Sequence, residues 1–256
     1  MPRQPLLPKF ANSKLTYGPL HVKTMPKIAE AVGRCIMLWS YVDWQMAMLL
    51  ASLMKANSEA SVAIFLTLKN ARAQREVLVA AAEMTLAGTN KEIFDAIMHI
   101  YGGLQTQRAD IAHGIFGRCS EISDGNAAPW IETKNLSRDW IERFHRPKSG
   151  GAPPGEDEQF RQKSFSYVYT IENLERLEYE IYALWGAVFT FAIAIDYPSS
   201  PTAVELCKRY PRYVIRKISR NLINNSVVKH ATRHADQISP CGLASAMRRD
   251  GTINIL

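Results

Sequence analysis

Residues 28–53 have the sequence IAEAVGRCIMLWSYVDWQMAMLLASL, in which apolar side chains recur at alternating steps of four and three. The recurring positions are Ile28, Val32, Cys35, Trp39, Val42, Met46, Leu49 and Leu53. This spacing is typical of a helix that packs one face against other helices. Thr24 is a candidate cap for this helix, Pro26 suits its first turn, and Ala56–Asn57 is expected to end it.

The same kind of pattern predicts further helices on both sides of a less regular middle segment. We expect them over residues 58–69, 71–86, 91–114 and 171–197. Asn70, Asn90 and Thr170 are the expected caps of the last three, and Gly114 is a favoured glycine at a helix end. Because short connections join long helices, neighbouring helices should be antiparallel. The sequence therefore predicts a mainly α protein built as an antiparallel helical bundle.

The middle segment is expected to carry a small β-containing insertion before the last core helix. Residues 115–135 mix β-branched and aromatic residues with glycine, which predicts a strand pair that turns at Asp124–Gly125. Residues 164–169 alternate aromatic and polar side chains and predict another strand. A short helix over 138–144 and an exposed loop over 149–158 would lie between them. The insertion thus covers about 115–169.

The charge is unevenly distributed along the chain and separates three regions. The formal net charge is +7, but residues 207–256 alone hold ten Lys and Arg against two Asp and Glu. The remainder is therefore close to neutral. We expect an extended N-terminal lead-in over 1–24, a helical core over 25–200 that includes the β insertion, and a basic C-terminal extension over 201–256.

Several classes of protein are disfavoured by composition and motif content. The four cysteines have no paired spacing, which argues against a zinc cage or disulfide framework and favours the cytoplasm. The charge-free apolar run over 181–195 is shorter than a membrane span and predicts a buried core helix. No Gly-x-Ser-x-Gly or phosphate-binding Gly-Lys-Ser/Thr motif is present. We expect no metal, cofactor or membrane partner.

The most informative polar residues lie at the end of the helix predicted over 91–114. Arg108 falls where the apolar face formed by Ile93, Ile97, Ile100 and Leu104 should continue. A buried arginine needs an acidic partner or a shared polar cavity. Asp110 lies three residues before His113, so its carboxylate could orient the imidazole. An ordinary interpretation remains open, in which Arg108 ends the helix and His113 bonds its last carbonyls.

Helix geometry limits how Arg108 and His113 could act together. Five residues separate them by about 140° around the axis and about 7.5 Å along it. Both could reach one phosphate through the long arginine side chain, a loosened last turn, or a second subunit. In a homodimer, two copies of the motif facing each other would place two arginines and two histidines in one cleft. This arrangement is a hypothesis that explains an arginine on a packing face.

The motif Arg-x-x-x-x-His, continuing as Ile-Ala-His-Gly at a helix end, resembles that of the HEPN domain family. The resemblance extends to the helices around 39–43, 71–83 and Leu184, and spans about residues 25–197. It implies a dimeric helical core and, in many members, metal-independent endoribonuclease activity in toxin or antiphage systems. Arg108 would stabilise the charge of the phosphorane, and His113 would act as general base or acid.

Two further positions bear on this resemblance. The family often carries an acidic residue in the first long helix, and Asp43 is the matching candidate to hold the guanidinium of Arg108. A solvated carboxylate on the helix flank is the alternative for Asp43. Ala109 follows Arg108 where nuclease members commonly have asparagine. A non-catalytic dimeric interaction or nucleotide-binding module therefore remains the alternative function, and a cognate antitoxin or partner protein is not identified by the sequence.

The basic extension is a second candidate site. Its cations alternate with aromatic and aliphatic residues such as Tyr210 and Tyr213. Cations neutralise phosphates and tyrosines stack on bases, so this pattern predicts RNA contact. The candidate residues are Lys208, Arg209, Arg212, Arg216 and Lys217. A merely solubilising terminus is the alternative interpretation.

Overall fold

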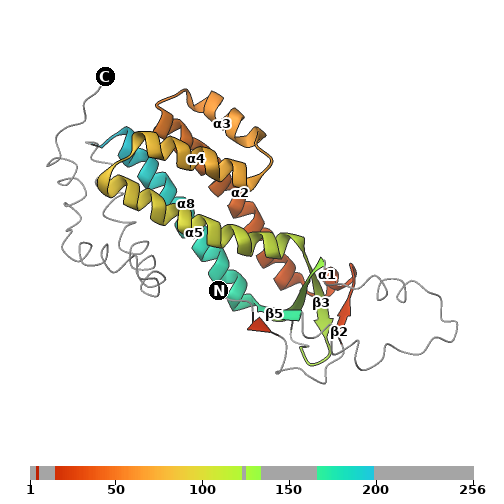
Figure 1. Cartoon of the computed structure of the whole chain (residues 1–256). Helices are drawn as coiled ribbons and strands as arrows, with labels where there is room; N and C mark the ends of the chain where they lie inside the picture. Colours follow the sequence, from red (N-terminus) through yellow and green to blue (C-terminus); the bar gives the residue numbers. More distant parts are fainter. Residues whose placement is uncertain (1–3, 6–14, 123–124, 134–165, 199–256) are drawn as a thin grey trace, which may run out of the picture. The chain divides into compact units, whose positions relative to one another are not determined.

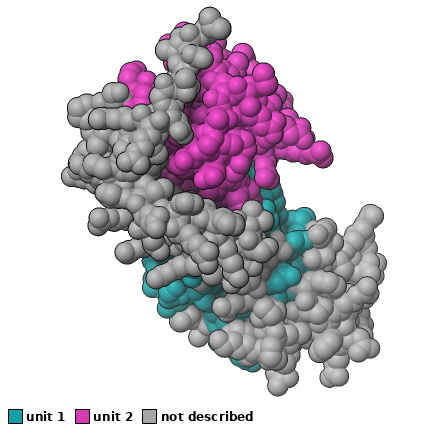
Figure 2. Space-filling model, turned by 60° about the vertical axis from the view of Figure 1, so that its left-hand side comes forward, with its two compact units in different colours: residues 1–39, 104–180 teal, residues 40–103, 181–256 magenta. Residues whose placement is uncertain are grey.

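The structure is a computed structural model that describes residues 4–5, 15–122, 125–133 and 166–198. These residues form six helices and five strands, so the predicted mainly α protein with a small antiparallel sheet is confirmed at that level. The expected helix over 138–144, the loop over 149–158 and the extension over 201–256 lie outside the described residues. The chain divides into two compact units, 1–39 with 104–180 and 40–103 with 181–256 (Figure 2).

The first unit contains the sheet. Its strands are β1 (Gln4–Pro5), β2 (Leu15–Tyr17), β3 (Gly114–Cys119), β4 (Ala127–Glu132) and β5 (Ser166–Thr170) (Figure 1). The order across the sheet is β1-β5-β4-β3-β2, and every neighbouring pair is antiparallel. The predicted strand pair is confirmed as β3 and β4, with Gly125 at φ +69 in the connection between them. The strand predicted over 164–169 is confirmed as β5.

The N-terminal lead-in is more structured than the sequence suggested. It contributes both edge strands of the sheet, and a short helix α1 (His21–Thr24) follows β2. The Tyr17 ring passes over Gly117, where any side chain would meet it, and its hydroxyl shares a buried 2.8 Å hydrogen bond with Ser166. Thr24 was wrongly predicted as the next helix's cap, because it closes α1 and donates to the His21 carbonyl at 2.9 Å.

Three long helices have residues in both units. They are α2 (Pro26–Met54), α5 (Gly88–His113) and α8 (Ile171–Asp196). Two further helices, α3 (Ser58–Thr67) and α4 (Ala71–Thr85), belong entirely to the second unit. The second unit buries a set of large apolar side chains, among them Met46, Leu49, Phe65, Leu78, Phe94, Leu184 and Val188. These include the later positions of the predicted apolar face on residues 28–53.

Side-chain caps fix two of the four helix starts at which the sequence predicted them. The Asn70 amide oxygen accepts from the backbone N–H of Arg72 at 2.8 Å. Thr170 accepts from the N–H of Asn173, whose own side chain accepts from the N–H of Thr170. The prediction for Asn90 is wrong, because α5 begins two residues earlier at Gly88, which adopts φ +53. Gly supplies that left-handed conformation without strain.

Helix α8 carries the predicted apolar run. By length and composition it is the one helix in the described ranges that could cross a membrane. Core helices of other proteins meet the same criterion. Its apolar positions are extensively buried, including Leu174, Leu177, Ile181, Val188 and Phe191. Burial of this face agrees with the interpretation of α8 as a core helix.

Candidate functional site

The motif residues lie where helix α5 meets the sheet of the first unit. Arg108 and Asp110 are half-buried, whereas His113 is exposed and is the last residue of the helix. Strand β3 begins at the next residue, Gly114, with no intervening loop. The Arg108, Asp110 and His113 side chains therefore project from the last turns of a single rigid element that leads directly into a strand.

Two side chains, one on β4 and one from the residue that follows β4, bond the end of this helix. The Trp130 indole Nε1 donates to the backbone carbonyl of Asp110 at 3.0 Å, and the Thr133 hydroxyl donates to that of His113 at 2.7 Å. The last carbonyls of a helix have no partner within it, so these donors satisfy groups that would otherwise need water. They fix the backbone that carries His113. The sequence did not reveal them, because each donor lies 20 residues from its acceptor.

Arg108 retains an unsatisfied donor. Its Nε is buried and has no hydrogen-bond partner, a condition shared within the described residues by Gln45 Oε1 and Trp185 Nε1. A buried N–H without an acceptor costs on the order of 1–3 kcal/mol, and more when the group is charged. The structure therefore holds the Arg108 guanidinium with one desolvated N–H that has no acceptor.

The other predicted site residues are not part of this helix end. Asp43 is half-buried on α2 and belongs to the second unit, whereas Arg108, Asp110 and His113 belong to the first. Its expected pairing with Arg108 stays a prediction. The cations of the basic extension, Lys208, Arg209, Arg212, Arg216 and Lys217, lie outside the described residues. The structure thus brings together three of the predicted residues.

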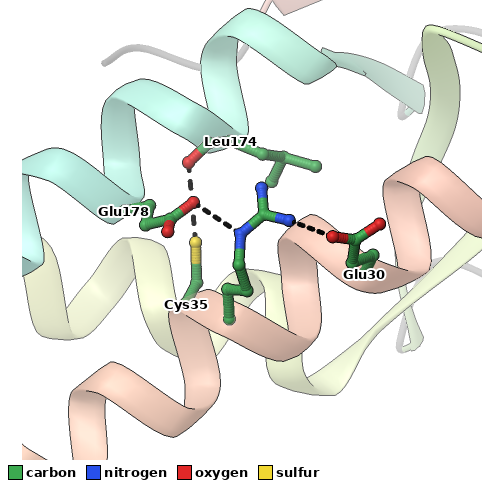
Figure 3. Close-up of polar contacts among 5 residues, drawn as sticks. Glu30, Cys35, Leu174 and Glu178 are labelled. Atoms are coloured by element: carbon green, nitrogen blue, oxygen red, sulfur yellow. Dashed lines mark hydrogen bonds and ion pairs between the residues drawn. The ribbon is translucent and has the colours of Figure 1, made fainter.

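A second polar cluster in the first unit involves Arg34, a residue that no motif or spacing had marked (Figure 3). Its guanidinium bonds Glu178 of α8 at 2.9 Å and Glu30 of α2 at 2.6 Å. The hydrogen bond to Glu178 is the main cause that raises the pKa of Arg34. Each of these charges has an opposite partner within the cluster, which is typical of a structural ion-pair network that joins two helices.

Cys35 lies beside this cluster and is fully buried. Its thiol donates to the Leu174 carbonyl at 3.5 Å (Figure 3). Burial raises the pKa of Cys35 to about 12, and the nearby Glu178 carboxylate adds to the effect. A thiol in this state has almost no thiolate at neutral pH and is a poor nucleophile. The cluster therefore stabilises the fold and offers no covalent chemistry.

Metal-ligand geometry and comparisons with other proteins add no further site. In the part of the chain that the structure describes, no group of three or more His, Cys, Asp and Glu residues is placed to hold a metal ion. Comparisons with family models, curated proteins and solved structures found no match to this chain. The end of α5, with the sequence motif found there, is therefore the candidate functional site.

Proposed function

We propose that this chain is a homodimeric, HEPN-like RNA-binding protein that cleaves RNA without a metal ion, in a defence or toxin-type system. The observation that carries the proposal is the partly buried Arg108, whose Nε lacks a partner, one helical turn and a half before an exposed His113. A fixed cation and a group that exchanges protons near neutral pH are what metal-free cleavage of an RNA phosphodiester requires.

In the proposed reaction, His113 removes the proton from a ribose 2′-hydroxyl as its oxygen attacks the adjacent phosphorus. The bond between phosphorus and the 5′-oxygen of the next nucleotide breaks. That oxygen takes up a proton from a protonated His113 of either protomer. Arg108 donates hydrogen bonds to the phosphorane oxygens, where negative charge accumulates. Asp110 serves as an orienting carboxylate, and the same role for Asp43 stays a prediction from the sequence. The products are a 2′,3′-cyclic phosphate and a 5′-hydroxyl.

A second protomer resolves the geometric limit of a single helix. Because Arg108 and His113 diverge by about 140° on an ideal helix, one copy presents them poorly to a single phosphate. Two copies of the helix end facing each other would let Arg108 of one act with His113 of the other. We therefore propose a HEPN-like helical bundle that dimerises with this symmetric cleft between its two copies.

Ala109 favours the alternative function. Its methyl group cannot bond the substrate or brace the guanidinium of Arg108, in contrast to the asparagine common in the family's nucleases. In this alternative, the same dimeric cleft binds a partner or a nucleotide without cleaving it. The unsatisfied Arg108 donor would then bind a phosphate as a static ligand.

An RNA-cleavage assay in EDTA separates the two functions. Purified protein would be incubated with total RNA beside the variants Arg108→Ala, His113→Ala and the matched control His99→Ala, an exposed histidine on the same helix. We expect cyclic-phosphate products with the wild type and His99→Ala, and their loss with either motif variant. Intact RNA with the wild type would contradict the endoribonuclease proposal and leave the non-catalytic module.

A further inference from the structure

Six apolar residues of the second unit form a surface that we call the aromatic patch. Tyr41, Trp44 and Met48 lie on α2, and Tyr182, Trp185 and Phe189 lie on α8. Tyr41 is 61% exposed, Trp44 46% and Tyr182 47%, and the other three are half-buried. Soluble monomers seldom expose contiguous large apolar side chains in this way, and such patches commonly mark interfaces.

Tyr41 and Trp185 share a face with the contact that joins the two helices in this unit. The Ser52 hydroxyl of α2 donates to the Asp196 carboxylate of α8 at 2.6 Å, which brings the last turns of both helices together. Tyr41 precedes Ser52 by eleven residues, and Trp185 precedes Asp196 by the same number. Eleven residues make about three helical turns, so each ring lies on the same side of its helix as the contact.

The aromatic rings on α8 contact one another in a continuous row. The Trp185 and Phe189 ring centroids are 5.6 Å apart with an interplanar angle of 7°, and the Tyr182 and Trp185 centroids are 5.7 Å apart. Side chains already stacked in this way lose little conformational freedom when a partner covers them. Tyr, Trp, Phe and Met are also the residues enriched at the centres of protein interfaces.

The charges around the patch narrow the choice of partner. Residues 40–54 and 181–195 contain no Lys or Arg, and Asp43 is their one charged residue. A nucleic acid needs cations for its phosphates, so this surface does not suit one. At one end of the patch, Lys55 of α2 is paired with Asp196 of α8 at 3.2 Å, and both remain partly exposed.

That pair places a cation on α2 and an anion on α8 at the same end of the patch. A two-fold axis along the helices would place α2 of one protomer against α8 of its partner. Lys55 would then approach the partner's Asp196, and the rings of the two patches would cover each other. We propose that the aromatic patch is the surface on which a second copy of this chain docks, a proposal that rests on the homodimer of the proposed function.

The test is sedimentation equilibrium of the full chain at micromolar concentrations. We compare the wild type with Tyr41→Ser/Trp44→Ser and with Ile64→Ser, which removes an exposed apolar side chain of α3 that is 59% exposed and outside the patch. The double variant should raise the dissociation constant of the dimer on the order of a hundredfold, and Ile64→Ser should leave that constant unchanged. Circular dichroism and thermal unfolding verify that each variant is folded.

Each outcome has a distinct meaning. A wild-type dimer that persists in the folded double variant would overturn this surface while leaving the homodimer intact. A monomeric wild type would overturn both the surface and the homodimer, and the RNA-cleavage assay would still report on the chemistry separately. Flotation of a monomeric wild type with phosphatidylcholine vesicles, lost in the double variant, would instead assign the patch to a lipid surface and overturn the proposal.

Discussion

The indole of Trp130 occupies the space into which a side chain at Gly114 would project. A Cβ atom built on Gly114 would overlap the ring at Nε1 and its neighbouring carbons. The same Nε1 donates to the Asp110 carbonyl at 3.0 Å, so the ring cannot withdraw without losing that hydrogen bond. The glycine that ends the motif is therefore required by packing, and it lets the sheet hold the helix that carries His113.

Replacing Gly114 by alanine should therefore destabilise the protein. We expect Gly114→Ala to lower the free energy of unfolding by at least about 2 kcal/mol, because a well-packed site must expand. Gly103→Ala is the control, since Gly103 lies on α5, the helix that directly precedes Gly114, with nothing within 4 Å of its added Cβ. It should be neutral or stabilising by up to about 1 kcal/mol. Urea denaturation measures both, and equal stability of the two variants would contradict the packing argument.

The buried hydroxyl of Tyr17 should make stability depend on pH in the alkaline range. Burial raises the pKa of Tyr17 from 10.0 to about 12. Between these values the unfolded chain releases a proton that the folded protein keeps. The contribution of the protonated Tyr17 hydroxyl to the free energy of unfolding is thus fully present below pH 10 and is lost as the pH rises through about 12.

Tyr17→Phe isolates this contribution. At neutral pH the variant should lose about 1 kcal/mol, because the buried 2.8 Å hydrogen bond with Ser166 is removed. At pH 11 the difference from the wild type should shrink by about 1 kcal/mol, since only the wild type has an ionisable side chain at position 17. Urea denaturation at pH 7 and pH 11 gives both numbers. A difference that stays constant with pH would show that Tyr17 ionises normally.

Cys35 should resist alkylation in the folded protein. Its pKa of about 12 leaves about one thiolate in ten thousand molecules at pH 8, and the side chain has no exposed surface. We expect iodoacetamide to label the Cys35 peptide in urea but not under native conditions, as followed by mass spectrometry. Rapid native labelling at Cys35 would contradict its burial between α2 and α8 of the first unit.

The basic extension should govern the salt dependence of RNA binding. If Lys208, Arg209, Arg212, Arg216 and Lys217 contact phosphates, changing all five to Gln should flatten the slope of log affinity against log salt. The expected change is up to about 3.5 for a single strand. The control changes four cations nearer the C-terminus, Lys229, Arg233, Arg248 and Arg249, to Gln. An unchanged slope of log affinity against log salt in the five-residue variant would contradict the predicted RNA contact.

Local signals predicted the elements that are built from local contacts. The apolar spacing located α2 within about two residues at each end, and Asn70 and Thr170 cap helices through atoms two or three residues away. The β3–β4 pair was predictable because a short connection with a recognisable turn signal, Asp124–Gly125, joins the two strands. In each case the residues that decide the structure are close together in the sequence.

Contacts between distant residues were not predictable in this way. Strands β1 and β2 are two and three residues long, too short to show alternation, and their partners lie about a hundred or more residues away. The same reason conceals the role of Trp130 at the helix end. For the candidate site, the sequence supplied the identity of Arg108 and His113. It did not supply the unsatisfied Nε or the sheet that holds the helix.

The contrast between Thr170 and Asn90 offers a final test of how the helices begin. Both residues precede an apolar helical pattern, but only Thr170 accepts a backbone hydrogen bond, from Asn173 at 3.2 Å, whereas Asn90 lies inside α5. Thr170→Ala should cost about 1 kcal/mol of unfolding free energy. Asn90→Ala should cost nothing, since alanine is the better helix former. Thermal unfolding of the two variants decides the matter, because a loss at Asn90 equal to that at Thr170 would mean that α5 starts where the sequence alone placed it.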